Sequence, residues 1–159
     1  YGLVGSEMCI RDRLYLEDIT PGLRFRSSEH RMETADIRRF AADYDPQPFH
    51  LDEEAGRASF FGGLAASGWH TAAVTMRLLV GGGAPLAGGI IGAGGEIRWP
   101  QATRPGDVLH VESEVLDVVP SRSRPDRGMV TLKSRTLNQK GEEVQVLTAK
   151  LVVFRKPVD

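Results

Sequence analysis

The sequence predicts a single α+β domain in which one long helix packs against an antiparallel sheet of about five strands. Its length of 159 residues, 41% of them hydrophobic, allows one well-buried core and leaves no room for a second sizeable domain. After residue 90 the chain alternates strand-like runs with turns. Before it, one segment carries apolar residues at helical spacing: Trp69, Ala72, Ala73, Met76, Leu79 and Val80.

The first thirteen residues are treated separately from the domain. Residues 4–12 match the read-through translation of a common transposase sequencing adapter, so we interpret residues 1–13 as non-native and assign the domain to residues 14–159. A native N-terminal tail is the alternative. The chain's one cysteine, Cys9, lies in this tract, which would leave the domain without a thiol for disulfides or zinc. No signal-peptide core is present, which predicts a cytoplasmic protein.

The N-terminal half of the domain begins with a predicted strand over residues 23–31. A short helix is expected over residues 34–42, with Thr34 as its N-cap. Residues 52–58 should form one or two further helical turns. The long helix should then start at Gly68, present a buried face through the apolar residues named above, and end at the glycines 81–83.

The C-terminal half is expected to form four strands, over residues 90–99, 108–119, 128–138 and 144–154. Turn-forming sequences separate them, notably at residues 104–107 and 138–141. In an α+β domain of this kind, the helices lie on one face of the antiparallel sheet.

Charge and hydropathy exclude two classes of partner. The net charge of −1 provides no positive field for gripping nucleic acid. No apolar run approaches the length of a membrane span. A small-molecule substrate is the simplest expectation.

An acid and an imidazole stand five residues apart on a proline-containing segment, and such a pair can hold one water molecule. Each proline fixes its own φ and disfavours helix for the residue before it, so Asp45 and Gln47 should be extended or in a turn. The alternative is that Asp45 and His50 only cap a helix or close a turn. The segment reads Asp45-Pro46-Gln47-Pro48-Phe49-His50.

A run of small residues leads into the long helix and supplies a second chemical element. It extends from Phe61 to Gly68. Free backbone N–H groups and the positive end of the helix dipole at Gly68 can stabilise a developing oxyanion, and glycine lets a substrate approach closely.

With these residues the sequence resembles the MaoC-like dehydratases and (R)-specific enoyl-CoA hydratases, a family with the hotdog fold. The family signature is G-D-x-N-P-x-H, followed by a glycine-rich turn and the start of the long helix. The resemblance places the catalytic pair on Asp45 and His50 and the oxyanion-hole glycine on Gly68. The signature here reads Tyr44-Asp45-Pro46-Gln47-Pro48-Phe49-His50, then Phe61-Gly62-Gly63, then Ser67-Gly68.

The chain departs from the family pattern at three positions. Tyr44 replaces the signature's glycine, and Ser67 stands where a histidine often precedes the oxyanion-hole glycine. Gln47 replaces the asparagine that orients the dyad and its water, and keeps the amide while reaching one methylene further. Candidates for contact with the acyl group are Phe49, Ser67, Trp69 and His70.

The resemblance implies reversible hydration of a trans-2-enoyl-CoA to an (R)-3-hydroxyacyl-CoA. Coenzyme A would enter as part of the substrate, with no metal or other cofactor, and the chain would form a homodimer or higher homo-oligomer. A loop with Arg122, Arg124 and Arg127 could hold the coenzyme A phosphates, or be a solvated hairpin tip. A hotdog thioesterase and a non-catalytic acyl-thioester binding protein are the alternatives.

Overall fold

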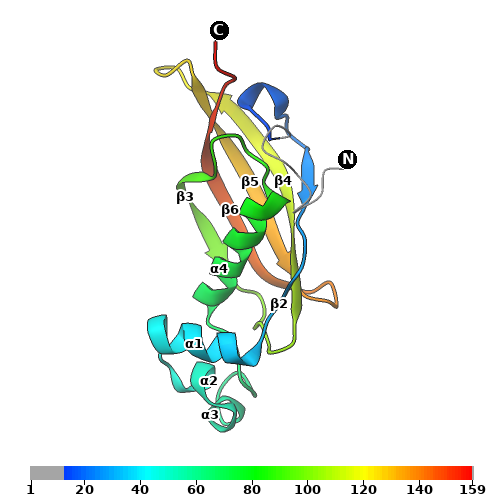
Figure 1. Ribbon diagram of the computed structural model, residues 1–159, viewed down its shortest axis with the longest axis vertical. Helices are drawn as coiled ribbons and strands as arrows, with labels where there is room; N and C mark the ends of the chain where they lie inside the picture. Colours follow the sequence, from blue (N-terminus) through cyan, green and yellow to red (C-terminus); the bar gives the residue numbers. More distant parts are fainter. Residues whose placement is uncertain (1–12, 159) are drawn as a thin grey trace.

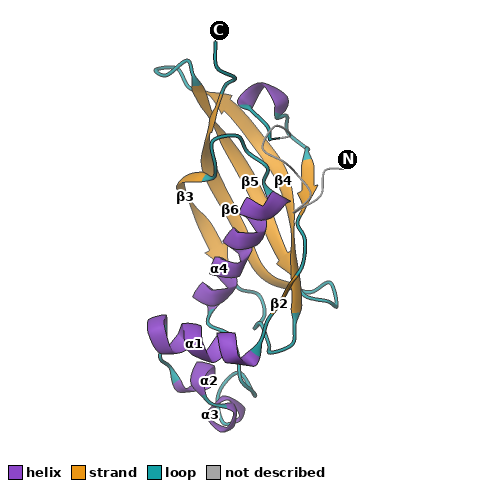
Figure 2. Ribbon diagram, viewed as in Figure 1, coloured by secondary structure: helices purple, strands orange, loops and turns teal. Residues whose placement is uncertain are grey.

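The computed structural model describes residues 13–158, which form one antiparallel sheet with a helix lying across it (Figure 1). The sheet order is β1-β4-β5-β6-β3, and β2 adds to one end of β4. This is the hotdog arrangement that the sequence predicts. Three further helices gather at one end of the sheet, and the β4–β5 turn lies at the other end (Figure 2).

The four C-terminal strands agree with the prediction to within one residue at each end. They are β3 (Ile91–Arg98), β4 (Val108–Pro120), β5 (Arg127–Leu137) and β6 (Glu143–Phe154). Burial alternates regularly along β5, because successive side chains of a strand point to opposite faces. The inward side chains form the core with the helix; among them are Leu109, Val111, Val130, Leu132, Val144 and Val153.

The long helix α4 (Gly68–Leu78) starts at the predicted glycine and continues as a wide turn over Leu79–Gly83. Gly82 in that turn has φ +142°, a conformation that suits glycine. The predicted buried face was wrong in part. Trp69, Met76 and Val80 are exposed, and the face toward the sheet instead carries Thr71, Val74, Thr75 and Leu78.

The N-terminal segment differs from the prediction in two places. The single predicted strand is split into β1 (Arg24–Arg26) and β2 (His30–Arg31), and their register against β4 shifts by one residue. Ser27 fills the gap, because its hydroxyl accepts the Val111 N–H that the irregular backbone leaves free. The predicted cap on the first helix was also wrong: α1 (Thr34–Tyr44) has Glu33 at its N-cap position and no side-chain cap bond.

The two remaining short helices lie between α1 and α4. They are α2 (Pro48–Leu51) and α3 (Glu53–Arg57), the latter capped by Asp52, whose carboxylate accepts the Ala55 N–H. A further single turn, η3 (Leu16–Asp18), precedes β1. Among residues 13–158, no helix is long and apolar enough to cross a bilayer.

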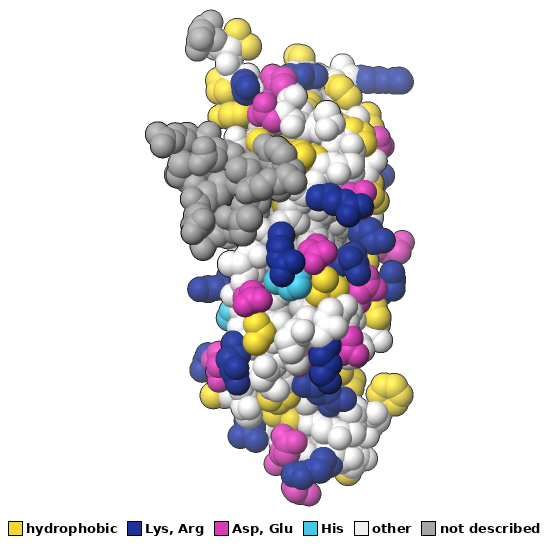
Figure 3. All heavy atoms as spheres, turned by 90° about the vertical axis from the view of Figure 1, so that its right-hand side faces the viewer, with side chains coloured by type: hydrophobic (Ala, Val, Ile, Leu, Met, Phe, Trp, Pro, Cys, Tyr) yellow, Lys and Arg dark blue, Asp and Glu magenta, His cyan; other side chains and the backbone are white. Residues whose placement is uncertain are grey.

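Positive and negative side chains alternate over the face shown in Figure 3. That distribution agrees with the near-zero net charge of the chain. The interpretation of residues 1–13 as adapter-derived falls almost entirely outside the described residues and stays a prediction.

Candidate active site

The acid and the imidazole are positioned by the ends of two short helices. Asp45 is the C-cap of α1, with an extended φ of −155°, and its N–H donates to the Ala41 carbonyl. Gln47 is extended and precedes α2, with Pro48 in the first helical position. His50 lies on α2 and is buried. The prolines therefore keep Asp45 and Gln47 out of helix as predicted, while the residues after Gln47 form a helical turn.

Asp45 and His50 face each other at close range. The distance from Asp45 Oδ2 to His50 Nε2 is 3.3 Å, and His50 Nδ1 lies 2.6 Å from the Ala65 carbonyl oxygen. A carbonyl only accepts, so we assign the ring proton of neutral His50 to Nδ1. Nε2 and an ionised Asp45 would then both be acceptors. The pair must share one proton or a donor such as water between them.

Both oxygens of Asp45 are held by neutral donors. Gln47 Nε2 donates to Oδ1 at 2.6 Å, and Ser67 Oγ donates to Oδ2 at 2.6 Å. Burial raises the pKa of Asp45, but the hydrogen bonds from Ser67 and Gln47, and the attraction of His50 when its ring is protonated, outweigh it, so the pKa lies below its ordinary value. Asp45 is therefore a carboxylate at neutral pH.

The start of helix α4 presents an unoccupied backbone donor. Ser67 is the N-cap and its side chain accepts the Trp69 N–H. No acceptor for the Gly68 N–H lies within residues 13–158. The indole of Trp99 covers the α-carbon of Gly68 so closely that a β-carbon there would lie 2.7 Å from Trp99 Cε2. Only glycine fits between the helix and this ring.

One cavity of about 580 Å³ joins these elements. Its wall includes His50, Gln47 and Gly68, so the histidine and the first residue of α4 border the same space. Asp45 does not itself line the cavity but is bonded to Gln47 and paired with His50, which do. Most of the remaining wall is apolar or aromatic: Phe49, Phe60, Phe61, Ala66, Trp99, Pro100, Ala102 and Val144.

Comparison with known proteins shows which family this fold belongs to. The model of the MaoC-like domain family matches residues 19–139. The chain belongs to the MaoC-like dehydratase family. A MaoC-like dehydratase from Rhodospirillum rubrum is 67% identical, with a TM-score of 0.90, over 91% of this chain and 99% of that one.

Two further relatives cover most of this MaoC-like domain. The uncharacterized protein YdeM of Bacillus subtilis (strain 168) is 35% identical over 89% of this chain and 98% of its own length. The (R)-hydratase from A. caviae involved in PHA biosynthesis is 26% identical, with a TM-score of 0.67, over 88% of this chain and 99% of its own.

The structure separates the predicted acyl contacts of this MaoC-like domain. Phe49 lines the cavity. Ser67 is fully buried and contacts Asp45 instead. Trp69 lies outside the lining, 59% exposed, with its ring edge-to-face against Trp99. His70 points to the other side of α4 and stacks on Phe40 at 4.7 Å. Trp69 and His70 do not line this cavity, and their contact with an acyl group stays a prediction.

Two of the residues that shape the cavity were not singled out from the sequence as parts of a site. Trp99 directly follows β3, and its Nε1 donates to the buried Gln145 side chain at 3.0 Å. Thr71, one turn into α4, donates its hydroxyl to Thr103, another lining residue, at 2.9 Å. No local motif marks Trp99, because it reaches the cavity only through tertiary packing, whereas Thr71 lies three residues after Gly68 on the same helix and helical spacing could have indicated it.

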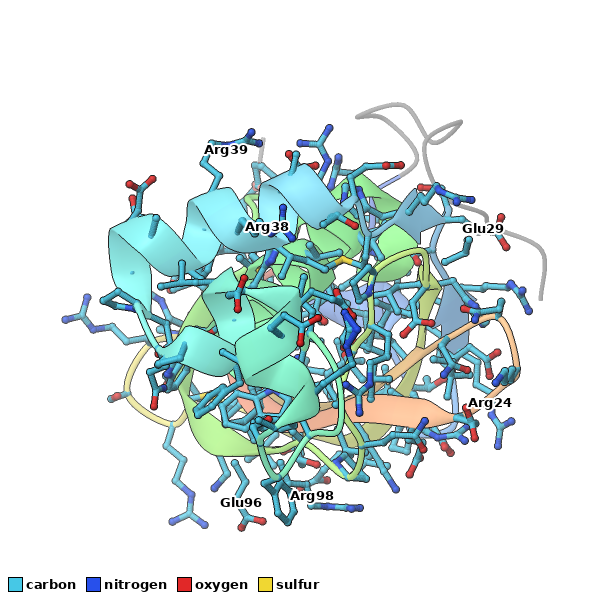
Figure 4. The ribbon with its side chains drawn as sticks, turned by 90° about the horizontal axis from the view of Figure 1, so that it is seen from below. Arg24, Glu29, Arg38, Arg39, Glu96 and Arg98 are labelled. Carbon is cyan, nitrogen blue, oxygen red and sulfur yellow. The ribbon has the colours of Figure 1, made fainter. Side chains whose placement is uncertain are left out.

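The arginines differ in how close the fold places them to this cavity. Arg104 lines the cavity and donates to the carbonyls of Phe61 and Leu64. The loop that carries Arg122 and Arg124 lies between β4 and β5, at the opposite end of the sheet from α2. Viewed from the helical end, Arg39 on α1 and Arg98 on β3 project to opposite sides (Figure 4). Arg104 is therefore the arginine that the fold places at this cavity.

Proposed function

We propose that this chain catalyses reversible addition of water to a trans-2-enoyl thioester, with coenzyme A as the thiol, giving an (R)-3-hydroxyacyl thioester. The observation that carries the proposal is the Asp45–His50 contact of 3.3 Å at a cavity whose wall also includes Gly68. The (R)-hydratase from A. caviae has the same fold, which supports the reaction class.

In this mechanism the dyad holds the nucleophilic water. Asp45 and His50 together take one proton as the oxygen adds at C3 and supply one at C2. The two groups titrate as a coupled pair, so the roles of acid and base belong to the dyad as a unit. Gln47 holds the carboxylate in place through its amide.

The thioester carbonyl would lie against the start of α4. Its oxygen would accept the Gly68 N–H, which stabilises enolate character as C3 is attacked. A donor of this kind contributes about 3 kcal/mol to lowering the barrier. The thioester serves as the electron sink, so the reaction calls on no metal and no redox group.

A thioesterase is less well supported by the arrangement of α4. Such an enzyme of this fold would be expected to place a carboxylate on or beside the central helix. Helix α4 carries neither Asp nor Glu over Gly68–Leu78. A binding-only protein would leave the Asp45–His50 pair and the Gly68 N–H without a chemical role.

We also propose that two copies of the chain associate through β3 and the outer face of α4. Among the described strands β3 pairs only with β6, so its other edge is open. Ile91 on β3 and Met76 and Trp69 on α4 are exposed apolar side chains. An open edge with apolar neighbours favours pairing with another chain. Light scattering should give the mass of a dimer or a multiple of it; a monomer would contradict the proposal.

The test of activity is a panel of trans-2-enoyl-CoAs from crotonyl-CoA upward, followed by loss of the conjugated thioester absorbance. The parent protein should hydrate at least one member, and Asp45→Asn should abolish turnover while binding is retained, because the amide keeps the shape but not the charge. Hydration at an unchanged rate in Asp45→Asn would remove the dyad from the mechanism. Release of free coenzyme A would identify a thioesterase, and binding without turnover a binding protein.

A further inference from the structure

Ser67 is fully buried at the point where the dyad meets helix α4. Its hydroxyl oxygen lies 2.6 Å from Asp45 Oδ2 and 3.2 Å from the Trp69 nitrogen. An ionised carboxylate can only accept and an N–H can only donate, so the hydroxyl proton goes to Asp45 and a lone pair accepts the Trp69 N–H. The one hydroxyl therefore joins the acid of the dyad to the first turn of α4.

The direction of these bonds constrains both parts of the site. Oδ2, the oxygen that Ser67 holds, is also the oxygen that faces His50, while Gln47 holds Oδ1. The carboxylate cannot rotate without breaking a charge-assisted hydrogen bond. On the other side, Ser67 immediately precedes Gly68, which lines the cavity and whose N–H has no acceptor among the described residues.

We propose that Ser67 is a positioning residue for the hydration reaction, holding the Asp45 carboxylate ionised toward His50 and in fixed relation to the Gly68 N–H. This inference rests on the proposed function. It assigns to the serine a role different from contact with the acyl group, since Ser67 has no place in the cavity wall.

A simpler role is that of an N-cap, and the chain offers a matched control for it. Asp52 caps α3 in the same way, accepting the Ala55 N–H at 2.9 Å, and its carboxylate has no contact with the dyad. Glycine keeps most of the capping preference that alanine loses, yet has no hydroxyl. The variants Ser67→Ala, Ser67→Gly, Ser67→Thr and Asp52→Ala therefore separate the cap from the bond to Asp45.

The experiment measures kcat, KM and the pH dependence of kcat/KM on the best enoyl-CoA, with circular dichroism to establish folding. Ser67→Ala and Ser67→Gly should both lower kcat by about tenfold or more, with KM within about twofold. In both variants the acidic limb of the kcat/KM profile against pH should move to higher pH, because loss of the Ser67 donor raises the pKa of Asp45. Ser67→Thr should recover most of the rate, and Asp52→Ala should lose thermal stability but keep the parent's kcat.

A second readout does not depend on turnover. The ¹³C carboxyl resonance of Asp45 should titrate at higher pH in Ser67→Gly than in the parent. Unchanged kcat and acidic limb in the hydroxyl-free variants would overturn the proposal, as would a folded Ser67→Thr no better than Ser67→Ala. If the parent hydrates no enoyl-CoA, the proposed activity fails, and the Asp45 titration still decides whether Ser67 holds the carboxylate.

Discussion

Two buried histidines lie near the first turn of α4, and they differ in what surrounds them. His50 is 4% exposed, with one ring nitrogen against the Ala65 carbonyl and the other against Asp45. His70 is 7% exposed, stacks on Phe40, and has a buried Nδ1 with no hydrogen-bond partner among the described residues. The cavities that they line share no residue.

The comparison shows that burial alone does not make a histidine chemically useful. Burial lowers the pKa of His70, and the nearby His30 and Arg39 lower it further against the opposing effect of Asp36. His70 is thus a neutral, largely apolar packing residue. His50 has a fixed tautomer and a carboxylate partner, which are the features that let an imidazole move a proton.

Exchanging each histidine for glutamine should give the largest difference. His50→Gln should lower kcat/KM for hydration by about a thousandfold, since it removes proton transfer by the dyad. His70→Gln should stay within about threefold of the parent. Steady-state rates on one enoyl-CoA measure both. Equal losses in the two variants would mean that His50 acts only through packing.

A smaller effect is expected on the cavity side of α4 at Gly68. Gly68→Ala forces the new methyl into the Trp99 ring, which should cost about 1 to 3 kcal/mol of unfolding free energy and slow hydration as the ring or the helix moves. Gly81→Ala is the control, because a β-carbon there meets nothing within 4 Å. Urea unfolding and kcat measure the pair. A Gly68→Ala variant as stable and active as Gly81→Ala would contradict the close packing.

The smallest expected effect is that of His70 on the stability of the fold at acidic pH. Its pKa in the folded chain lies below the ordinary value of 6.5, so as the pH falls below 6.5 the unfolded chain takes up the proton first. The parent should therefore lose stability below about pH 6.5, down to the folded-state pKa. His70→Leu should lose less stability than the parent between pH 7 and pH 5. Identical pH profiles for the parent and His70→Leu would exclude this origin.

What the sequence predicts well is what depends on local chemistry. The strands after residue 90 follow alternation and turn residues, and the non-helical backbone at Asp45 and Gln47 follows from the prolines. The sequence did not predict which face of α4 packs on the sheet. Threonines face the sheet, while Trp69 and Met76 face outward. Apolar spacing finds a helix but cannot tell a core face from a face left for another surface. Trp99 reaches Gly68 only through tertiary packing, which no local pattern contains.

The threonines beneath α4 fix how far along its axis the helix lies. Thr71 pairs with Thr103 and, one turn later, Thr75 pairs with Thr136 at 2.7 Å. Sliding the helix by one turn, about 5.4 Å, could bring Thr71 opposite Thr136 but would leave the hydroxyls of Thr75 and Thr103 buried without a hydrogen-bond partner. Each buried hydroxyl without a partner costs about 1 to 3 kcal/mol of stability. The two threonine pairs thus allow only one position of α4 along its axis. That position also fixes where the Gly68 N–H lies relative to the cavity.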